Sequence, residues 1–388
     1  MAGTFGFLST HPPTHCGLAT FNSSLATHLT AGGAAGGVVR VTAGGDDDQA
    51  ARTGRLGPSD LDVVHTWSAR SPAGWWDAAA ALNNFDVAIV QHEYGIYPGP
   101  DGADVLPLLR QLAVPSIVVL HTVLAQPTVA QKEVLEQIVA AASAVVTMTD
   151  TARDRLLVAY AVDAAKVTVI PHGTADHASA PTEPHERPHL LTWGLLGPGK
   201  GIEWALRAVA RLRDLKPTPS YTIAGRTHPK VLEHEGEAYR EGLHRLGGLL
   251  GISNTVQYQP VYRDVDALGR LIRSADVVVL PYDSREQVTS GALVESVAAG
   301  VPVIATPFPH AVELLTDGPG LLVPHQDPAA LAAAIRRILC EPGLAASLAS
   351  RTRQLTPTLL WPAVAARYAA LARQVAAAAP PAVAAASA

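Results

Sequence analysis

The chain has 388 residues, of which 48% are hydrophobic and 16% are charged, and its formal net charge is −5. This length is enough for two domains of ordinary size that each bury a core, and the mildly acidic balance argues against bulk binding to nucleic acid or to an anionic membrane. Because the sequence contains neither a long apolar run nor a basic, apolar leader, we expect a cytoplasmic protein without a transmembrane segment.

Short apolar runs alternate with helical patterns through the first half of the chain. Runs of this kind, rich in Val and Ile, predict βαβ units around a buried parallel sheet. The predicted strands are residues 4–8, 38–42, 62–66, 86–91, 116–121, 144–148 and 167–170, and helical patterns occupy residues 18–29 and 128–142. The sequence therefore predicts a Rossmann-like domain over residues 1–173.

The pattern stops at residues 174–188, TADHASAPTEPHERP, where prolines and the lack of a hydrophobic period predict a linker or hinge. The alternation then restarts. Strands are predicted at residues 190–193, 221–224, 255–258, 276–280 and 301–305, and helices at 202–212, 236–250, 264–273 and 290–299. These elements predict a second Rossmann-like domain over residues 189–356.

The closing segment is Ala-rich. We expect a helix over residues 357–375 that crosses back to the first domain, and an Ala- and Pro-rich tail over residues 376–388. The expected fold class is thus α/β, with two doubly wound domains facing across a cleft. In such sheets ligands bind outside the carboxyl ends of the strands, so the chemistry is expected there.

The segment LTWGLLGPGKGIEWAL places a Gly-rich loop between a predicted strand and a predicted helix. Glycines such as Gly199 let the backbone approach a ligand closely, and a helix N-terminus presents free N–H groups to an anion. Lys200 adds a positive charge suited to a phosphate. The loop is neither the dinucleotide fingerprint GxGxxG nor a P-loop.

A second loop follows the predicted strand at residues 276–280. Thr289, Ser290 and Gly291 bring hydroxyl and N–H groups to the start of the next helix. Glu295 lies a little over one turn into that helix. A carboxylate in this place can accept hydrogen bonds from both ribose hydroxyls of a nucleotide.

This second block, DSREQVTSGALVESVAAGVPVIATPFPHA, resembles the donor-site motif of GT-B glycosyltransferases, in particular the retaining family four. The family's usual form is Glu, seven residues, Glu, then Ala-x-Ala-x-Gly-x-Pro-Val, and Glu295 stands at the second Glu. The resemblance covers nearly the whole chain. It implies a nucleotide-sugar donor on the C-terminal domain, an acceptor mainly on the N-terminal one, and retention of anomeric configuration without a cofactor or an obligatory metal ion.

Other segments match the family's site positions. The resemblance implies these roles: Gly17 in HPPTHCGLATF beside the donor phosphate or sugar, His92, Glu93 and Tyr94 in QHEYGIYPG near the acceptor, His121 in LHT near the transferring sugar, and Lys200 on the diphosphate. Together with Glu295, His121 and Lys200 are the expected catalytic residues.

The sequence departs from the family's pattern at two positions. Gln287 stands where the first Glu of the motif is expected, and it can bind a sugar hydroxyl but carries no charge. Leu195 stands where the family often has an Arg. Arg226, after the next predicted strand, is a candidate for the missing cation. The donor base stays open between UDP and GDP, and the expected group is a hexosyl unit.

No metal site is expected. The acidic run Asp46–Asp48 follows a predicted strand, but Gly44 and Gly45 beside it are typical of a solvated turn. The two cysteines, Cys16 and Cys340, form neither a zinc spacing nor a disulfide framework.

Three other interpretations compete with a hexosyltransferase that acts on a saccharide or glycoconjugate acceptor. An NAD-dependent oxidoreductase needs GxGxxG after its first strand, where this chain has STHPPTHCG. A sugar phosphorylase needs a pyridoxal-binding lysine environment, which the sequence does not reveal. A degenerate, non-catalytic member that binds a sugar nucleotide or a protein partner is favoured by Gln287 and Leu195.

Overall fold

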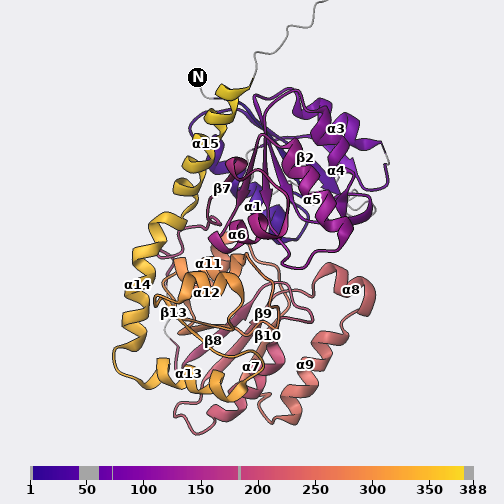
Figure 1. The fold of residues 1–388 in the computed structure, drawn as a ribbon. Coiled ribbons are helices and arrows are strands. Elements are labelled where there is room, and N and C mark those ends of the chain that lie inside the picture. Colours follow the sequence, from indigo (N-terminus) through magenta and orange to yellow (C-terminus); the bar gives the residue numbers. More distant parts are fainter. Residues whose placement is uncertain (1–2, 43–60, 72, 182–184, 380–388) are drawn as a thin grey trace, which may run out of the picture. The chain divides into compact units, whose positions relative to one another are not determined.

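The computed structural model describes residues 3–42, 61–71, 73–181 and 185–379. The acidic run Asp46–Asp48 lies outside these ranges. The chain divides into two compact units: unit 1 is Met1–Gly173 with Trp361–Ala388, and unit 2 is Thr174–Leu360. Figure 1 labels many of their elements.

Unit 1 contains a seven-stranded parallel sheet with strand order β3-β2-β1-β4-β5-β6-β7. Its strands are β1 (Phe5–Ser9), β2 (Gly36–Thr42), β3 (Val63–Ser68), β4 (Val87–His92), β5 (Ser116–Leu120), β6 (Ala144–Thr147) and β7 (Val167–Val169). The central strands are buried along their whole length, as the continuous Val- and Ile-rich runs predict. The strand order reverses between β1 and β4, which places the switch point of this sheet there.

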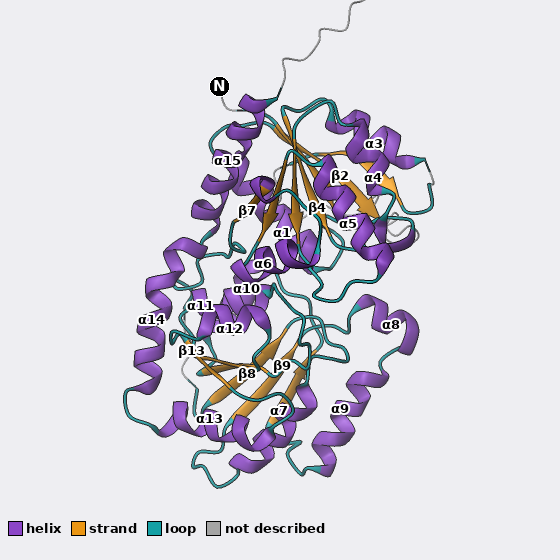
Figure 2. Ribbon diagram, viewed as in Figure 1, coloured by secondary structure: helices purple, strands orange, loops and turns teal. Residues whose placement is uncertain are grey.

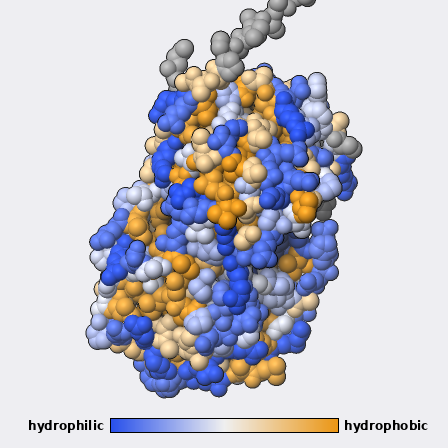
Figure 3. Space-filling view, in the orientation of Figure 1, coloured by the Kyte–Doolittle hydropathy of each residue, from blue (hydrophilic) through white to orange (hydrophobic). Residues whose placement is uncertain are grey.

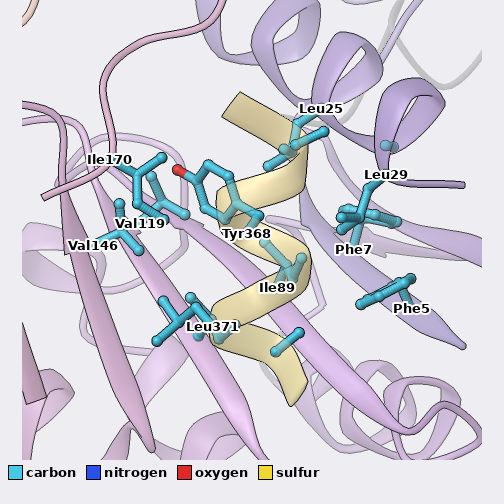
Figure 4. Packing of buried hydrophobic residues seen from close by; sticks show 14 of the residues in the cluster. Phe5, Phe7, Leu25, Leu29, Ile89, Val119, Val146, Ile170, Tyr368 and Leu371 are labelled. Carbon is cyan, nitrogen blue, oxygen red and sulfur yellow. The ribbon is translucent and has the colours of Figure 1, made fainter. Parts of the chain in front are cut away.

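Helices cover both faces of this sheet (Figure 2). They are α1 (Gly17–Thr30), α3 (Gly74–Leu82), α4 (Val105–Gln111), α5 (Val129–Ala141), α6 (Asp150–Ala159) and α15 (Trp361–Ala378), with 3-10 turns η1 (Pro100–Gly102) and η2 (Ala164–Lys166). Helix α15 packs on α1, and its Tyr368 and Leu371 join the same buried cluster as Phe7 and Ile89 of the sheet (Figure 4). The C-terminal helix is therefore part of the core of unit 1.

The chain leaves unit 1 after Gly173 and returns to it at Trp361, and these two residues lie against each other. A Cβ atom on Gly173 would lie 2.2 Å from the Trp361 ring, so only glycine fits there without a shift. The Trp361 ring also meets Phe21 of α1 edge to face, with 5.1 Å between the ring centroids. The returning helix is thus anchored at its first residue.

Unit 2 contains a six-stranded parallel sheet with strand order β10-β9-β8-β11-β12-β13. Its strands are β8 (His189–Trp193), β9 (Ser220–Ala224), β10 (Val256–Gln259), β11 (Val277–Leu280), β12 (Val303–Ala305) and β13 (Gly320–Leu322). The order reverses between β8 and β11, so the loops that follow these two strands flank the switch point of the second sheet. Each unit is thus a doubly wound parallel α/β domain, as the alternation predicts.

Two clusters of buried hydrophobic residues fill the layers between this sheet and its helices. The helices of unit 2 are α7 (Ile202–Val209), α8 (Pro229–Glu235), α9 (Ala238–Leu249), α10 (Val265–Arg273), α11 (Gly291–Ala298), α12 (Pro309–Leu315), α13 (Pro328–Cys340) and α14 (Leu344–Leu359), with a 3-10 turn η3 (Ala210–Leu212).

Three details differ from the expectations. The helix expected over residues 236–250 is preceded by a separate α8, because Gly236 takes a left-handed φ of 62° and ends that helix. The helix expected over residues 357–375 is two helices: Leu360 is extended, and Pro362 lies in the first turn of α15, where its missing N–H is tolerated. Strand β13 is not predicted by the sequence, because its apolar run is only three to four residues long.

The segment expected as a linker, residues 174–188, begins inside unit 2. Thr174 is fully buried, and its N–H donates to the carbonyl of Leu359 over 2.9 Å. His177 is 3% exposed. The proline-rich composition therefore does not reveal that Thr174 and His177 are packed inside unit 2.

No helix in the described ranges is long and apolar enough to cross a membrane. On the face seen in Figure 3, hydrophilic residues are interspersed among the hydrophobic ones.

Candidate functional site

The candidate donor loop of unit 2 extends the pairing of β8 and β9 beyond the ends of both strands. The N–H of Leu196 donates to the carbonyl of Arg226 over 2.8 Å, and the N–H of His228 donates back to the carbonyl of Leu196 over 2.8 Å. A Cβ atom on Gly199 would meet nothing within 4 Å. The loop is therefore fixed at its base and open at Gly199, as a close approach of a ligand to the backbone requires.

Lys200 lies over the face of an aromatic ring. Its Nζ is 4.3 Å from the centroid of the Tyr282 ring, which is a cation–π distance. Tyr282 is 1% exposed and stacks on Phe308, with 5.2 Å between centroids. Its carbonyl accepts a hydrogen bond from the Thr306 hydroxyl at 2.6 Å. The ammonium group is thus held by a ring that cannot move freely.

A second contact joins the loop that carries Lys200 to the loop after β11. The N–H of Asp283 donates to the carbonyl of Gly199 over 2.9 Å, and the Trp204 indole donates to both carboxylate oxygens of Asp283 at 3.0 and 3.1 Å. The two loops that flank the switch point therefore form one hydrogen-bonded unit.

Arg226 lies on the loop after β9 and is exposed. The buried Arg240 of α9 fixes this loop, because its Nη2 donates to the Gly225 carbonyl and to the Thr227 hydroxyl, each at 3.1 Å. The Thr227 hydroxyl in turn donates to the Glu237 carboxylate. That hydrogen bond first, and the charges of Arg240 and Arg226 after it, lower the pKa of Glu237. Arg226 thus sits among further charges and near the donor loop.

The start of α11 is held from two sides. The Ser290 hydroxyl caps the helix by accepting from the Leu293 N–H at 3.3 Å, and the Ser290 N–H donates to Nδ1 of His310 over 2.9 Å. Gln287 donates to the Thr289 carbonyl over 3.0 Å. The Thr289 hydroxyl is buried and has no hydrogen-bond partner within the described structure.

Glu295 is on α11, which begins at Gly291. Its side chain keeps 16% exposure, and its Oε2 accepts a hydrogen bond from Nε2 of His177, whose side chain is 4% exposed. Lys200 and Glu295 therefore follow the two strands at the switch point of unit 2. Gly199, Thr289 and Ser290 lie on the loops after the same two strands, and Gly291 begins α11.

In unit 1 the corresponding loops follow β1, β4 and β5. Gly17 begins α1 and is exposed, and a Cβ atom there would meet nothing within 4 Å. The Cys16 thiol caps the same helix by accepting from the Ala19 N–H at 3.4 Å. Gly17 thus offers open backbone beside the end of β1.

His121 ends a buried chain of polar side chains. Its Nε2 is 2.9 Å from the amide oxygen of Gln91, whose amide nitrogen donates to Asn22 at 3.5 Å. Asn22 donates to Nδ1 of His11 at 3.3 Å. The Gln91 oxygen requires a proton on Nε2 of His121, which leaves Nδ1 of that ring as a hydrogen-bond acceptor.

The pKa of His121 is lowered to about 3, first by burial and then by the nearby His172 and His92. The ring is therefore neutral at physiological pH. A neutral imidazole with a free Nδ1 can accept a hydrogen bond from a sugar hydroxyl.

The residues expected near the acceptor lie close together after β4. The Glu93 carboxylate accepts from the Thr122 hydroxyl at 2.5 Å and from the Tyr94 N–H at 3.0 Å. His92 is 1% exposed, and its ring meets Tyr94 edge to face. Neither ring nitrogen of His92 has a hydrogen-bond partner within the described structure. Glu93 and Tyr94 are half-buried, so they are the more accessible part of this group.

Within the ranges that the structure describes, no three His, Cys, Asp or Glu side chains are grouped so that they could hold a metal ion.

Two family profiles match the chain, one in each half. Residues 16–178 match the profile described as Glycosyltransferase Family 4, and residues 187–341 match the profile described as Glycosyl transferases group 1. Together they span most of both units. The chain belongs to the group 1 glycosyltransferases.

Curated relatives of this family member are D-inositol 3-phosphate glycosyltransferases. The protein from Streptomyces bingchenggensis is 31% identical over 229 residues, which are 55% of this chain and 49% of that relative. The protein from Thermomonospora curvata is 32% identical over 180 residues, which are 45% and 40% of the two chains. The chain thus spans about half the length of the curated relatives that it matches.

Solved structures share the fold over nearly the whole chain. Anabaena HepE in complex with UDP and glucose gives a TM-score of 0.76 at 16% identity and covers 96% of this chain and 100% of that one. Sucrose-phosphate synthase from Thermosynechococcus elongatus gives a TM-score of 0.77 at 21% identity, with coverages of 97% and 100%. These likenesses confirm the GT-B architecture of two Rossmann-like domains.

Several residues that shape the two sites of this group 1 member are not predicted by the sequence. His177 falls in the expected linker, and Tyr282 and His310 lie in or beside the donor motif without any separate signal. Gln91 and Asn22 belong to predicted elements. Their pairing joins residues 69 positions apart, which no spacing rule along the chain reveals.

We predict that unit 1 becomes less stable as the pH is lowered, and that His92 contributes to this loss. Burial lowers the pKa of His92 to about 4 from 6.5. Between these values the unfolded state binds more protons than the folded state, so this histidine stabilises the fold above about pH 6.5 and loses that contribution on acidification. We expect His92→Leu to reduce the drop in unfolding free energy between about pH 7 and about pH 5 by about 2 kcal/mol, measured by urea unfolding. An identical drop in both proteins would contradict the assignment.

Proposed function

We propose that this protein is a retaining glycosyltransferase. It would move a hexosyl group from a nucleoside-diphosphate sugar to a saccharide or glycoconjugate acceptor without requiring a metal ion. The observation that carries the proposal is the place of Lys200 and Glu295, which follow the two strands at the switch point of unit 2. Doubly wound sheets bind nucleotides at that point.

The donor is assigned to unit 2. Glu295 accepts hydrogen bonds from the ribose hydroxyls, and Lys200 with the open backbone at Gly199 meets the diphosphate. Thr289, Ser290 and Gly291 supply further polar groups, and Arg226 is the candidate second cation. Gln287 is the candidate contact to a sugar hydroxyl, although its amide nitrogen already donates to Thr289.

Unit 1 supplies the groups assigned to the sugar and the acceptor. The free Nδ1 of a neutral His121 accepts from a hydroxyl of the transferring sugar, and Gly17 offers backbone to the donor. Glu93 and Tyr94, with the buried His92 behind them, are assigned to the acceptor side.

In the proposed reaction the bond between the anomeric carbon and the β-phosphate oxygen breaks, and a bond from that carbon to the acceptor oxygen forms. The acceptor proton passes to the departing β-phosphate, so the products are the glycoside and the nucleoside diphosphate. Negative charge grows on the β-phosphate during this step. A fixed ammonium group there stabilises the transition state more than the ground state.

UDP is the base to test first. HepE was crystallised with UDP and glucose, and the curated relatives are named for transfer to D-inositol 3-phosphate. The family membership also favours a transferase over the oxidoreductase and phosphorylase interpretations. A non-catalytic member remains the second candidate because Gln287 and Leu195 replace a charged Glu and Arg of the usual motif.

Donor binding is expected to be selective for one nucleotide base and insensitive to EDTA. Calorimetric titration with UDP, GDP and ADP, each with and without EDTA, should give a dissociation constant that EDTA leaves unchanged. A discontinuous assay with the matching sugar nucleotide should then release the diphosphate only when an acceptor is present. Binding without turnover across a broad acceptor panel would favour the non-catalytic candidate, and loss of binding in EDTA would overturn metal independence.

A further inference from the structure

His177 lies between two elements of unit 2 that hold its imidazole in place. Its Nε2 faces Oε2 of Glu295 on α11. On the other side is Gly269 of α10, where a Cβ atom would lie 2.5 Å from Nδ1 of His177 and 3.3 Å from two ring carbons. Any side chain on residue 269 would therefore displace the ring.

The backbone around His177 is also fixed. The N–H of Ala180 donates to the His177 carbonyl over 3.0 Å, and the Asp176 carboxylate accepts from the Ala178 N–H at 3.0 Å. Three residues earlier, the buried Thr174 is tied to Leu359. This short segment thus presents one imidazole to one carboxylate.

The pair differs in what it leaves accessible. The His177 side chain is 4% exposed, whereas the Glu295 side chain keeps 16%. The imidazole uses Oε2 of the carboxylate, and Oε1 is left for a ligand. A buried donor on one oxygen removes rotational freedom from the carboxylate and so orients the other oxygen.

We propose that His177 is a positioning residue that sets the selectivity of the donor site for ribose hydroxyls. It holds Oε2 of Glu295 so that Oε1 accepts a hydrogen bond from the nucleotide's ribose. The inference rests on the proposed function, because it assumes that Glu295 meets the ribose. It adds a residue from outside the donor motif, 118 positions away in the sequence.

The test uses calorimetry on the whole chain to compare binding of UDP with binding of 2′,3′-dideoxy-UDP. If GDP binds more tightly than UDP, GDP and 2′,3′-dideoxy-GDP are compared instead. We expect the wild-type protein to prefer UDP by about tenfold or more, the preference that follows from one lost hydrogen bond to a charged group. His177→Ala should lose most of this preference while its affinity for the dideoxy analogue stays within about twofold.

Two further variants separate positioning from general damage. His177→Gln can present an amide N–H to Oε2 and should recover most of the preference. Adding His177→Ala to a Glu295→Gln background should change the preference no further, because the carboxylate that it orients is gone.

A matched control is available at the opposite end of the same sheet. His185 and Asp276 form another His–carboxylate pair, with Nε2 and Oδ2 2.7 Å apart. Because Asp276 precedes β11, His185→Ala should leave the ribose preference unchanged. A wild-type preference in His177→Ala, with its loss in Glu295→Gln, would overturn the positioning role alone. A wild-type preference in Glu295→Gln as well would overturn the donor site itself.

Discussion

Lys200→Ala is expected to lower kcat by roughly 100- to 1,000-fold, the usual cost of removing a group that stabilises the charge developing in the transition state. The charge in question is on the departing β-phosphate. Nζ of Lys200 is held 4.3 Å from the centroid of the buried Tyr282 ring, so little reorganisation is needed when the phosphate charge grows. Single-turnover release of the diphosphate from the sugar nucleotide measures the effect.

The control for Lys200→Ala is Lys230→Ala. Lys230 is an exposed cation in the first turn of α8, and both lysines lie near enough to His228 to help lower its pKa, after burial. Losing the charge at residue 230 should reduce turnover less than about threefold, because an exposed charge is screened by solvent. Equal losses of turnover in the two variants would show that turnover depends only on the general positive potential and not on the position of Lys200.

Lys200→Arg adds a test of geometry. The guanidinium group keeps the positive charge but is planar and longer than the ammonium group. If position over Tyr282 matters, this variant should recover only part of the lost turnover. Full recovery would mean that charge alone is sufficient.

The fold is predictable from the sequence because the strands bury both faces. Runs such as residues 116–120, SIVVL, are buried at every position in the structure, so their apolar character shows directly in the sequence. The carboxyl ends of these strands are equally visible, because Gly, Lys and His residues follow them. The amino-acid sequence therefore suffices to place Gly199, Lys200 and His121 at strand ends.

Side chains that act through other side chains are not predictable in the same way. His177 comes from a segment whose composition indicates a linker, and its partner Glu295 is 118 residues away. Gln91 and Asn22 pair across two predicted elements. Such contacts depend on how elements pack, and neither hydrophobic period nor motif spacing records that packing.

The two units use a similar device at their strand ends. In unit 1 a buried amide, Gln91, fixes the tautomer of His121, and in unit 2 a buried imidazole fixes one oxygen of Glu295. In each pair the partner, Gln91 or His177, is less accessible than the residue that it orients, His121 or Glu295. An accessible side chain with a buried, hydrogen-bonded partner is already oriented when a ligand arrives, which reduces the entropy lost on binding.

The second large effect is expected at the start of α7. Gly201 takes a left-handed φ of 62°, and a Cβ atom there would lie 1.8 Å from the carbonyl oxygen of Pro281. Gly201→Ala must therefore move the backbone of the loop after β11 or that of the donor loop. We expect it to destabilise unit 2 by about 2–5 kcal/mol, the sum of left-handed strain and overpacking. Urea unfolding followed by tryptophan fluorescence measures this loss.

Gly343→Ala is the matched control, because Gly343 is also a left-handed residue just before a helix (φ 81°, ψ −12°, before α14), but a Cβ atom there would meet nothing within 4 Å. It carries the backbone strain without the clash and should cost only about 1–2 kcal/mol. The difference between the two variants then measures the contact between Gly201 and Pro281. Because Lys200 precedes Gly201 directly, Gly201→Ala should also weaken diphosphate binding, whereas Gly343→Ala should not. Equal destabilisation by both alanines would mean that the loops after β8 and β11 are not packed against each other as the structure has them.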